Sequence, residues 1–598
     1  MAQTAAMRSE KKTKKCGVPF LAGTLAVLFI LTVLLWGVSS GWGSISIKRT
    51  YLFADNGDKV SVISYIPDTA TNENPAPVVL NFHGRANSAH TLDAWSLEQA
   101  RRGYVVLNVD RSGAGESVFT SGENEAIYQY AMTLTFVDTE QVVVAGFSSG
   151  MGPVTELAAA HDNVVAAIHV FPPFIRESNG NLPTNHMLIK AGSDQYNFEE
   201  TGPRDVYEQG VAAFLGLDGE VTPGEIYGSF EDGTAKEYVF VPRALHQTAG
   251  VSKGAITAML SFMEQATDTP NPIDPASHIY WWAQFLALAC CVTMVVFAMA
   301  LGATLLKHPF FAEIVQPMPE NRGKRGWKLA LNILIAIGIP ICTFIPFSTF
   351  GMDVLAKNAI FPAKNFNGIW VWLMLNTLIT LAIMAFGYLR EKKAGEVVSL
   401  SHYALAPEGE SRLNGRCILK SLVLALCVAS IFYLWLQWID GFFGIGYQFM
   451  TLAAFTEVSP ERLAKAWSYI LVLFCVLFVG AIGMNTSRRL KETGDPRKDM
   501  AKAIALNALI AAAAVGLLLL SNYGIMILRG EGNGIFHFAE GQSSVGALNF
   551  AFAFPFLMGS MGAINTYYFR KTGTIWTGVF LTALIAGITA FVAQPLVM

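Results

Sequence analysis

Residues 43–277 contain no cysteine, although the 598-residue chain has seven. The same segment has no Asn-x-Ser/Thr glycosylation sequon. A disulfide framework is therefore excluded there, and the two absences together favour a bacterial plasma membrane over a eukaryotic secretory pathway. The cysteines of the chain are Cys16, Cys290, Cys291, Cys342, Cys417, Cys427 and Cys475.

Charge is also scarce. Asp, Glu, Lys and Arg make up 15% of the chain, against about 25% in soluble domains. Apolar residues gather instead in long runs, and a bilayer core needs about 20 of them per helix. The runs predict a multi-pass membrane protein with nine spans, near residues 18–40, 279–306, 328–350, 368–389, 418–439, 466–485, 502–526, 545–567 and 574–596.

The two kinds of charge are unevenly divided. Residues 43–277 hold 13 Lys/Arg against 29 Asp/Glu, a net charge of −16, and the rest of the chain holds 29 against 16, a net of +13. The sequence KKTKK at 11–15 precedes the first span. Under the positive-inside rule the N-terminus is cytoplasmic and residues 43–277 are extracytoplasmic.

Four later loops on the predicted cytoplasmic side are basic as well, which makes the alternation consistent across all spans. They contain Arg322, Lys324 and Arg325; Arg390, Lys392 and Lys393; Arg488, Arg489 and Lys491; and Arg570 and Lys571. We expect a basic N-terminus (1–17), an anchor helix (18–42), an extracytoplasmic domain (43–267), a Pro-rich linker (268–277) and a membrane domain (278–598). The first span is too long for a signal peptide and lacks a small-residue cleavage site.

In the extracytoplasmic domain, near-continuous apolar runs alternate with segments of helical spacing. This pattern predicts an α/β fold, a mostly parallel sheet covered by helices on both faces, with an antiparallel edge formed by its first strand pair. Strands are expected at 45–54, 59–67, 76–84, 104–110, 141–146, 164–171, 186–192 and 236–242, and helices at 92–103, 126–137, 150–162 and 252–266.

The fifth strand runs directly into Gly-Phe-Ser-Ser-Gly, at 146–150. A sharp strand–turn–helix junction leaves its turn residue projecting from the sheet, and glycines two positions away on either side relieve the crowding. A serine there has an exposed hydroxyl beside a helix N-terminus, which suits a nucleophile that forms an oxyanion. On these five residues alone, a Gly-rich turn with a capping serine is an equally good interpretation.

Four other segments extend the pattern: NFHGRANS (81–88), NVDRSGAGES (108–117), LIKAGSDQY (188–196) and VPRALHQ (241–247). Together with the serine motif they resemble the α/β-hydrolase fold family over about residues 45–267. The resemblance implies that Ser148 is the nucleophile, His246 the general base and Asp194 its acid partner, in that family's chain order. It also implies an oxyanion hole made by the backbone N–H groups of Ser149 and Arg85.

Neighbouring polar residues have plainer interpretations. We expect His83 to shape a turn, Asp110 and Ser117 to brace the site, and Asp138 to belong to a turn. Because residues 219–235 look like an insertion before the last strand, Asp218 and Glu225 remain alternative acids. His90, His161, His169 and His186 are the alternative bases. No long insertion separates 164–171 from 186–192, so the site is either open or capped by the membrane domain.

The membrane helices contain isolated polar residues, Asn332, Asn376, Asn507 and Asn549, which are typical of interhelical hydrogen bonds. The loop 441–463 is predicted to lie in the membrane interface, and a second loop, 528–544, contains His537 and Glu540. For both loops, anchoring and packing are favoured over lining a substrate site. The sequence shows no metal-ligand cluster and no phosphate loop, so no cofactor or metal is predicted. The acidic domain disfavours a nucleic-acid partner.

These features predict a membrane-anchored serine hydrolase of the esterase or lipase type. Its partner would be a lipid or acyl-ester substrate at the membrane surface, cleaved at an ester or thioester. An acyltransferase with the same triad is the first alternative, and a non-catalytic sensor or assembly subunit that keeps the fold is the second. The oligomeric state has no signal in the sequence.

Overall fold

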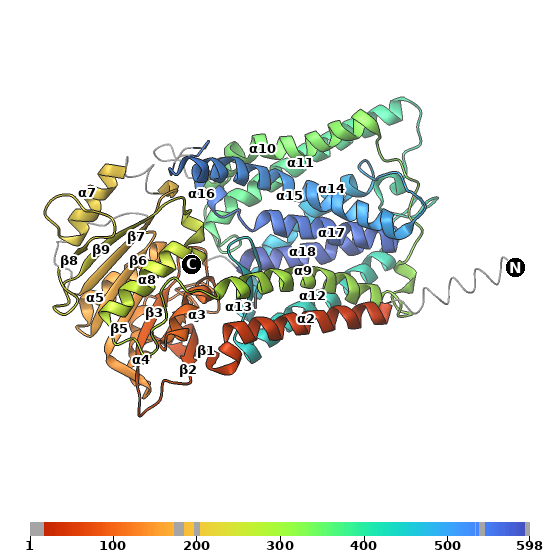
Figure 1. Cartoon of the computed structure of the whole chain (residues 1–598). Helices are drawn as coiled ribbons and strands as arrows, with labels where there is room; N and C mark the ends of the chain where they lie inside the picture. The colour runs from red at the N-terminus through yellow and green to blue at the C-terminus, as the bar shows by residue number, and fades with distance from the viewer. Residues whose placement is uncertain (1–16, 173–183, 197–203, 533, 537–543, 593–598) are drawn as a thin grey trace.

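A computed structural model of the chain describes residues 17–172, 184–196, 204–532, 534–536 and 544–592. Figure 1 shows a sheet flanked by helices beside a bundle of long helices. Helix α2 (Gly17–Ser39) leads from the bundle into the sheet domain, and α9 (Tyr280–Leu305) returns to the bundle. Cys16, the KKTKK segment, His537 and Glu540 lie outside the described residues.

The sheet has nine strands in the order β1-β2-β4-β3-β5-β6-β7-β9-β8. Strands β3, β4, β5, β6, β7 and β9 are parallel, and β1, β2 and β8 are antiparallel to their neighbours. The predicted fold class and its antiparallel edge are therefore confirmed. The strands are β1 (Ile45–Phe53), β2 (Lys59–Pro67), β3 (Ala76–Phe82), β4 (Val105–Val109), β5 (Val137–Phe147), β6 (Val164–Val170), β7 (Asn185–Ala191), β8 (Ile226–Tyr227) and β9 (Lys236–Val241).

Helices cover both faces of this sheet. On one face α3 (Asp93–Arg101) and α8 (Lys253–Ala266) share a hydrophobic core that continues into the helical bundle. On the other face α4 (Glu123–Thr133) and α5 (Met151–Ala160) pack over a separate core, and α7 (Arg204–Leu215) packs with Leu188 and Tyr238.

One expected helix, 126–137, was too long. Helix α4 ends at Thr133, and β5 already begins at Val137, which pairs with Ala76 of β3. The residues between them, Leu134 to Phe136, are rich in side chains that favour extended backbone, and the pairing with β3 outweighs helical spacing.

Seven described helices are long and apolar enough to cross a membrane. This agrees with a multi-pass membrane protein. They are α2, α9, α10 (Gly326–Val354), α11 (Lys364–Lys393), α12 (Gly415–Phe443), α14 (Trp467–Asn485) and α15 (Pro496–Arg529). The last two expected spans correspond to α17 (Phe554–Thr572) and the shorter α18 (Trp576–Val592), and the count of nine spans stays a prediction.

The expected span 545–567 is interrupted. It is divided into a short helix, α16 (Ser544–Asn549), and the long helix α17, with Asn549 at the break. Pro555 occupies the first turn of α17. Proline lacks the backbone N–H that a continuing helix needs, and its fixed φ suits the start of a new helix.

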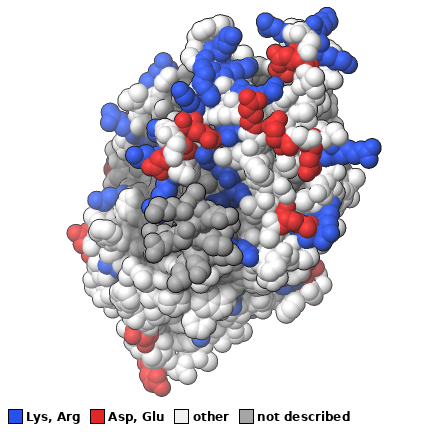
Figure 2. All heavy atoms as spheres, turned by 90° about the vertical axis from the view of Figure 1, so that its right-hand side faces the viewer, with Lys and Arg blue, Asp and Glu red and all other residues white. Residues whose placement is uncertain are grey.

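The four predicted basic loops lie at one end of the bundle, the end remote from the sheet. Hydrogen bonds link two of them directly: Lys324 N–H donates to Ser487 O (2.8 Å), and Arg325 donates to Arg489 O (2.8 Å). Figure 2 looks onto this end and shows Lys and Arg side chains, interspersed with Asp and Glu, mainly over the upper part of the view. The predicted grouping of the basic loops is therefore reproduced in three dimensions.

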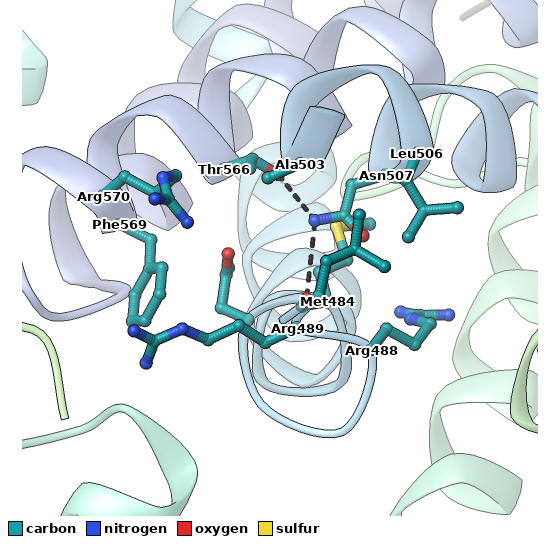
Figure 3. Close-up of a pocket in the computed structure, with 11 residues that line it drawn as sticks. Met484, Arg488, Arg489, Ala503, Leu506, Asn507, Thr566, Phe569 and Arg570 are labelled. Atoms are coloured by element: carbon teal, nitrogen blue, oxygen red, sulfur yellow. Dashed lines mark hydrogen bonds between the residues drawn. The ribbon is translucent and has the colours of Figure 1, made fainter. Parts of the chain in front are cut away.

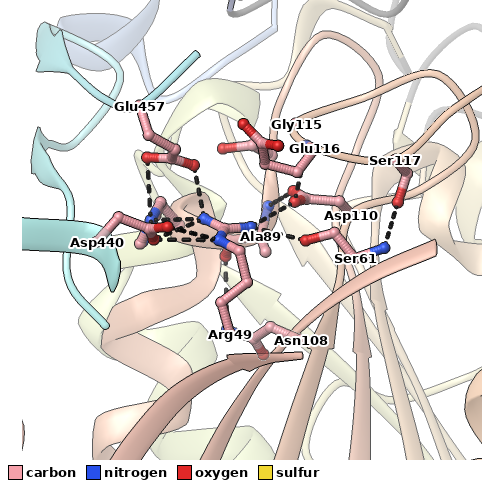
Figure 4. Close-up of polar contacts among 12 residues, drawn as sticks. Arg49, Ser61, Ala89, Asn108, Asp110, Gly115, Glu116, Ser117, Asp440 and Glu457 are labelled. Atoms are coloured by element: carbon pink, nitrogen blue, oxygen red, sulfur yellow. Dashed lines mark hydrogen bonds and ion pairs between the residues drawn. The ribbon is translucent and has the colours of Figure 1, made fainter. Parts of the chain in front are cut away.

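The two domains are joined by a buried charge cluster around Arg49 of β1 (Figure 4). Its guanidinium donates to Asp110 of the sheet domain (2.8 Å), to Asp440 of α12 (2.9 Å) and to Glu457 (2.6 Å). The four side chains are between 1% and 5% exposed. Because buried carboxylates need a cation close by, this arginine holds the sheet domain to the bundle.

The loop 441–463 reinforces this junction, and its place in the membrane interface stays a prediction. It forms a hairpin of β10 (Tyr447–Phe449) and β11 (Ala453–Phe455), followed by α13 (Pro460–Lys465). Buried Arg462 of α13 donates to the backbone carbonyls of Gly113 and Gly115 in the sheet domain. The expectation that this loop serves packing is met, but its packing partner is the sheet domain.

We expect Arg49→Gln to lower the free energy of unfolding by about 3–5 kcal/mol, because it leaves buried carboxylates without their cation. Arg322→Gln is the matched control. The Arg322 ion pair with Glu320 is exposed, so its loss should cost less than about 1 kcal/mol. Denaturant titration of both variants in detergent measures the difference, and equal effects would contradict the role given to Arg49.

Candidate active site

Ser148 stands at the end of β5, where the chain turns into a short 3-10 turn, η3 (Ser148–Gly150), and then into α5. Its φ is +53°, in the left-handed region that costs a non-glycine residue of the order of 1–3 kcal/mol. The flanking glycines are required by packing: a Cβ at Gly146 would overlap the carbonyl of Gly150, and one at Gly150 would overlap the carbonyl of Phe82. The strained serine turn expected from the sequence is therefore present.

The structure brings the three predicted triad residues together. His246 Nε2 lies 2.9 Å from Ser148 Oγ, and His246 Nδ1 lies 2.8 Å from Asp194 Oδ2. Ser148, Asp194 and His246 follow strands β5, β7 and β9, whose carboxyl ends meet at one edge of the sheet because these strands are parallel. The imidazole also contacts the rings of Phe147 and Tyr196, at centroid distances of 5.1 and 4.7 Å, which restrict its orientation.

Asp194 is fully buried, and burial by itself would raise its pKa. The opposing charges of His246 and Lys190 and the hydrogen bonds from His246 and from Tyr196 N–H outweigh burial, so that the pKa of Asp194 lies below its usual value. Lys190 Nζ is 3.9 Å from this carboxylate, and burial lowers the pKa of Lys190 to about 7. A carboxylate held ionised is the form that orients a histidine and stabilises its protonated ring.

The turn expected to supply an oxyanion donor lies next to the serine. Gly84 is so close that a Cβ there would be 3.0 Å from the Ser148 Cβ. Arg111, which follows β4, bridges this turn and the serine turn, because its Nη1 donates to His83 O (3.1 Å) and to Ser149 Oγ (2.9 Å). This arginine therefore sets the spacing of the two segments that carry Ser149 and Arg85. Sequence reasoning treated its segment only as a brace, although its position just after β4 was a usable signal.

The other polar residues noted in the sequence make hydrogen bonds that support the fold. His83 Nε2 accepts the Arg111 N–H (3.0 Å), and burial together with Arg111 lowers the pKa of His83 to about 4, which keeps the ring neutral. Asp138, expected in a turn, lies instead in β5, where it pairs with Pro77 of β3 and accepts from Glu140 N–H. Asp110 belongs to the domain junction, and Ser117 accepts the N–H of Ser61.

Alternative bases and acids are placed elsewhere. His161 pairs with exposed Glu125, and the rings of His169 and His186 stack on each other inside the sheet domain. Asp218 and Glu225 were the alternative acid partners of His246. In the structure, the carboxylate hydrogen-bonded to His246 is that of Asp194.

One cluster has the spacing of metal ligands. His90 Nε2, an oxygen of Asp440 and an oxygen of Glu457 lie within 4.8 Å of one another. Sequence reasoning missed it, because the residues come from both domains. Arg49 already donates hydrogen bonds to both carboxylates, so the cluster belongs to the domain junction.

A polar pocket lies in the bundle, between the end of α14, the first half of α15 and the end of α17 (Figure 3). Arg488, Arg489 and Arg570 line it, and Asn507 donates to Thr566 (2.9 Å) across it. The backbone carbonyl of Met526 in α15 accepts from Ser193, next to Asp194. Asn507 precedes Met526 by nineteen residues of the same helix, or about 29 Å at 1.5 Å per residue. This pocket is therefore separate from the triad.

No family model matches the chain, and no curated protein matches it. Among solved structures, similar ones include a thioesterase domain from the curacin biosynthetic pathway, at 13% identity and TM-score 0.27, covering 37% of this chain and 99% of that one. A putative dienelactone hydrolase from Klebsiella pneumoniae has 14% identity and TM-score 0.28, covering 37% and 100%. An esterase from Pyrococcus furiosus has 13% and 0.28, covering 37% and 90%. The α/β-hydrolase-type fold of the sheet domain rests on the order and direction of its own strands, independently of these similar structures.

We expect Gly146→Ala to destabilise the protein by about 1–3 kcal/mol, because the added methyl group must displace the Gly150 carbonyl of the serine turn. Gly152→Ala, six residues later in α5, is the matched control, since a Cβ there has open space around it. That change should leave stability unchanged or raise it by up to about 1 kcal/mol. Thermal unfolding compares the two, and a harmless Gly146→Ala would contradict the packing assigned to this turn.

Proposed function

We propose that the protein is a membrane-anchored serine hydrolase that cleaves an ester or thioester through an acyl-enzyme intermediate. The observation that carries this proposal is the continuous hydrogen-bonded series Ser148–His246–Asp194, built on a strained serine turn at the edge of a parallel sheet. A nucleophile bonded to a base, with the base oriented by a third group, is the arrangement that activates a serine.

The reaction follows from this geometry. Ser148 Oγ attacks the acyl carbon while its proton moves to His246 Nε2, and the carbonyl electrons form an oxyanion that the N–H groups of Ser149 and Arg85 stabilise. Collapse of this intermediate breaks the C–O or C–S bond, and His246 gives its proton to the leaving group. A water then attacks the acyl-Ser148 ester, gives its proton to His246, and the acid leaves as Ser148 regains the proton.

A lipid or other acyl ester at the membrane surface is the proposed substrate. Two features support it: the sheet domain is attached to the bundle at both ends and through the Arg49 cluster, and the triad loops contact the bundle, as described below. The basic loops at the remote end of the bundle support a cytoplasmic location for that end, and hence an extracytoplasmic triad in a plasma membrane.

An acyltransferase with the same triad is the second candidate. Ser148 and His246 are 7% and 6% exposed, so the triad is covered. A covered acyl-enzyme is protected from bulk water, which favours transfer to an acceptor that reaches the site through the bundle. The non-catalytic sensor or assembly subunit is the outcome that remains if Ser148 does not react.

We expect a fluorophosphonate probe to label the wild-type protein at Ser148, because such probes trap activated serines. Ser148→Ala should abolish labelling. Ser229→Ala, in the insertion before β9, should label as the wild type does. Mass spectrometry of the labelled peptide identifies the site. A wild-type protein that stays unlabelled would refute both enzymatic functions and leave the non-catalytic one.

The side of the membrane is tested with the same chemistry. A membrane-impermeant fluorophosphonate added to intact cells should reach Ser148 without permeabilisation. Labelling that occurs only after the cells are opened would place the triad in the cytoplasm and contradict the proposed orientation.

A further inference from the structure

The loop that carries the acid of the triad is bonded to a membrane helix. Ser193, directly before Asp194, donates through its hydroxyl to the backbone carbonyl of Met526 in α15 (3.0 Å). Gln195, directly after Asp194, donates to the Tyr523 hydroxyl one turn earlier in the same helix (3.3 Å). Ser193, Asp194 and Gln195 are all buried, so the acid is held from both sides by contacts with the bundle.

Asn549 joins this acid loop to the histidine loop. Its side-chain oxygen accepts from Gln195, from the Tyr523 hydroxyl and from Gln247 Nε2, the last at 2.8 Å. Gln247 directly follows His246. One amide oxygen therefore contacts the neighbour of Asp194, the neighbour of His246 and the helix α15.

The place of Asn549 in the fold is unusual. It is the last residue of α16, at the break in the expected span 545–567, and it is 7% exposed. Non-helical backbone at membrane depth is tolerated only where protein buries it or where it lines a cavity. The break thus puts a buried amide beside the triad, at a point where a continuous helix would have been expected.

Two other asparagines of the bundle, Asn376 and Asn507, behave as the sequence predicted. Asn376 of α11 accepts from Thr343 of α10 (3.1 Å), and Asn507 of α15 donates to Thr566 of α17 (2.9 Å). These are hydrogen bonds between membrane helices. Among the contacts of the described residues, Asn549 differs from Asn376 and Asn507 because its partners include both triad loops.

We propose that Asn549 is a positioning residue of the active site. It sets the separation of the Asp194 and His246 loops and fixes both to α15, so the membrane domain completes the catalytic geometry. This inference rests on the proposed function of Ser148. Its physical basis is that a triad must be held close to its productive geometry, and a displacement of about 1 Å can reduce the rate of reaction about 100-fold.

Removal of the Asn549 side chain would leave the buried donors of Gln195 and Tyr523 and the half-buried donor of Gln247 without this acceptor. Each would seek another partner, because an unsatisfied buried donor is costly. The two triad loops would then shift relative to each other. The expected consequence is slower attack by Ser148 in a protein that is still folded.

The test uses the full-length protein in detergent or nanodiscs and follows fluorophosphonate labelling over time. The final amplitude counts the molecules with a competent Ser148, and the rate constant reports how well the triad is positioned. Asn549→Ala should lower the rate constant by about 10-fold or more at an amplitude close to wild type. Asn507→Ala is the matched control, because it removes a buried hydrogen bond at the other end of α15.

Two milder variants keep the test independent of folding defects. Asn549→Asp retains an oxygen acceptor, which three donors can satisfy, and should recover most of the rate constant. Tyr523→Phe removes one donor to Asn549 and should slow labelling by a few-fold.

The outcomes separate the two proposals. An unlabelled wild type would overturn the proposed function and this inference with it. If the wild type is labelled, an unchanged rate constant in Asn549→Ala would overturn the positioning role alone. A reduced amplitude with an unchanged rate constant would also overturn it, because that result means a purely structural contribution.

Discussion

The arrangement of the two domains depends on the buried ion pairs of Arg49. This residue places one guanidinium between a carboxylate of the sheet domain, Asp110, and two carboxylates from the bundle side, Asp440 and Glu457. Buried charges of this kind tolerate little displacement, since each loses its compensation if the partner moves away. The sheet domain is consequently fixed to the bundle in one orientation, with its core continuous with that of the membrane helices.

This fixed orientation decides what surrounds the triad. The edge of the sheet that carries Ser148, Asp194 and His246 faces the helix α15 and the break between α16 and α17. The contacts of Ser193, Gln195 and Gln247 with that region are hydrogen bonds between side chains of one domain and groups of the other. Ser148 itself is 7% exposed, and of the two arrangements that the sequence left open, an exposed site and one capped by the membrane domain, the second stays a prediction.

Much of the sheet domain was predictable, because its signals are local. The alternation of apolar runs predicted eight of the nine strands within a few residues and missed the two-residue β8. The spacing of glycines around Ser148 reflects a steric need of that single turn. Asp194 and His246 each follow the end of a later strand. Because these strands are parallel to β5, their ends bring the two residues to the same edge of the sheet as Ser148. Helix α4 was overextended because helical spacing was weighed without the pairing of Val137 with Ala76.

The contacts between domains were beyond the sequence. Arg49 and Asp440 are 391 residues apart, and Gln195 and Asn549 are 354 apart, so no local pattern connects them. In the sequence, Asn549 has the same apolar surroundings as the other membrane asparagines. The helix break beside it lies within one apolar run, and the proline of that run was taken as part of a single span. Arg111 lies in a segment that the sequence analysis singled out. Its role could not be predicted, because it depends on the contacts with His83 and Ser149 that only the fold creates.

The most direct test of the account is to follow an acyl group from the bilayer to Ser148. Full-length protein would be placed in nanodiscs that contain an ester lipid with an isotope-labelled acyl chain, quenched with acid and digested. The account predicts the labelled acyl group on the Ser148 peptide of the wild type, and none in Ser148→Ala. An unmodified Ser148 with intact lipid, in a protein that still hydrolyses a water-soluble ester, would contradict the proposal that the substrate is an acyl ester of the membrane.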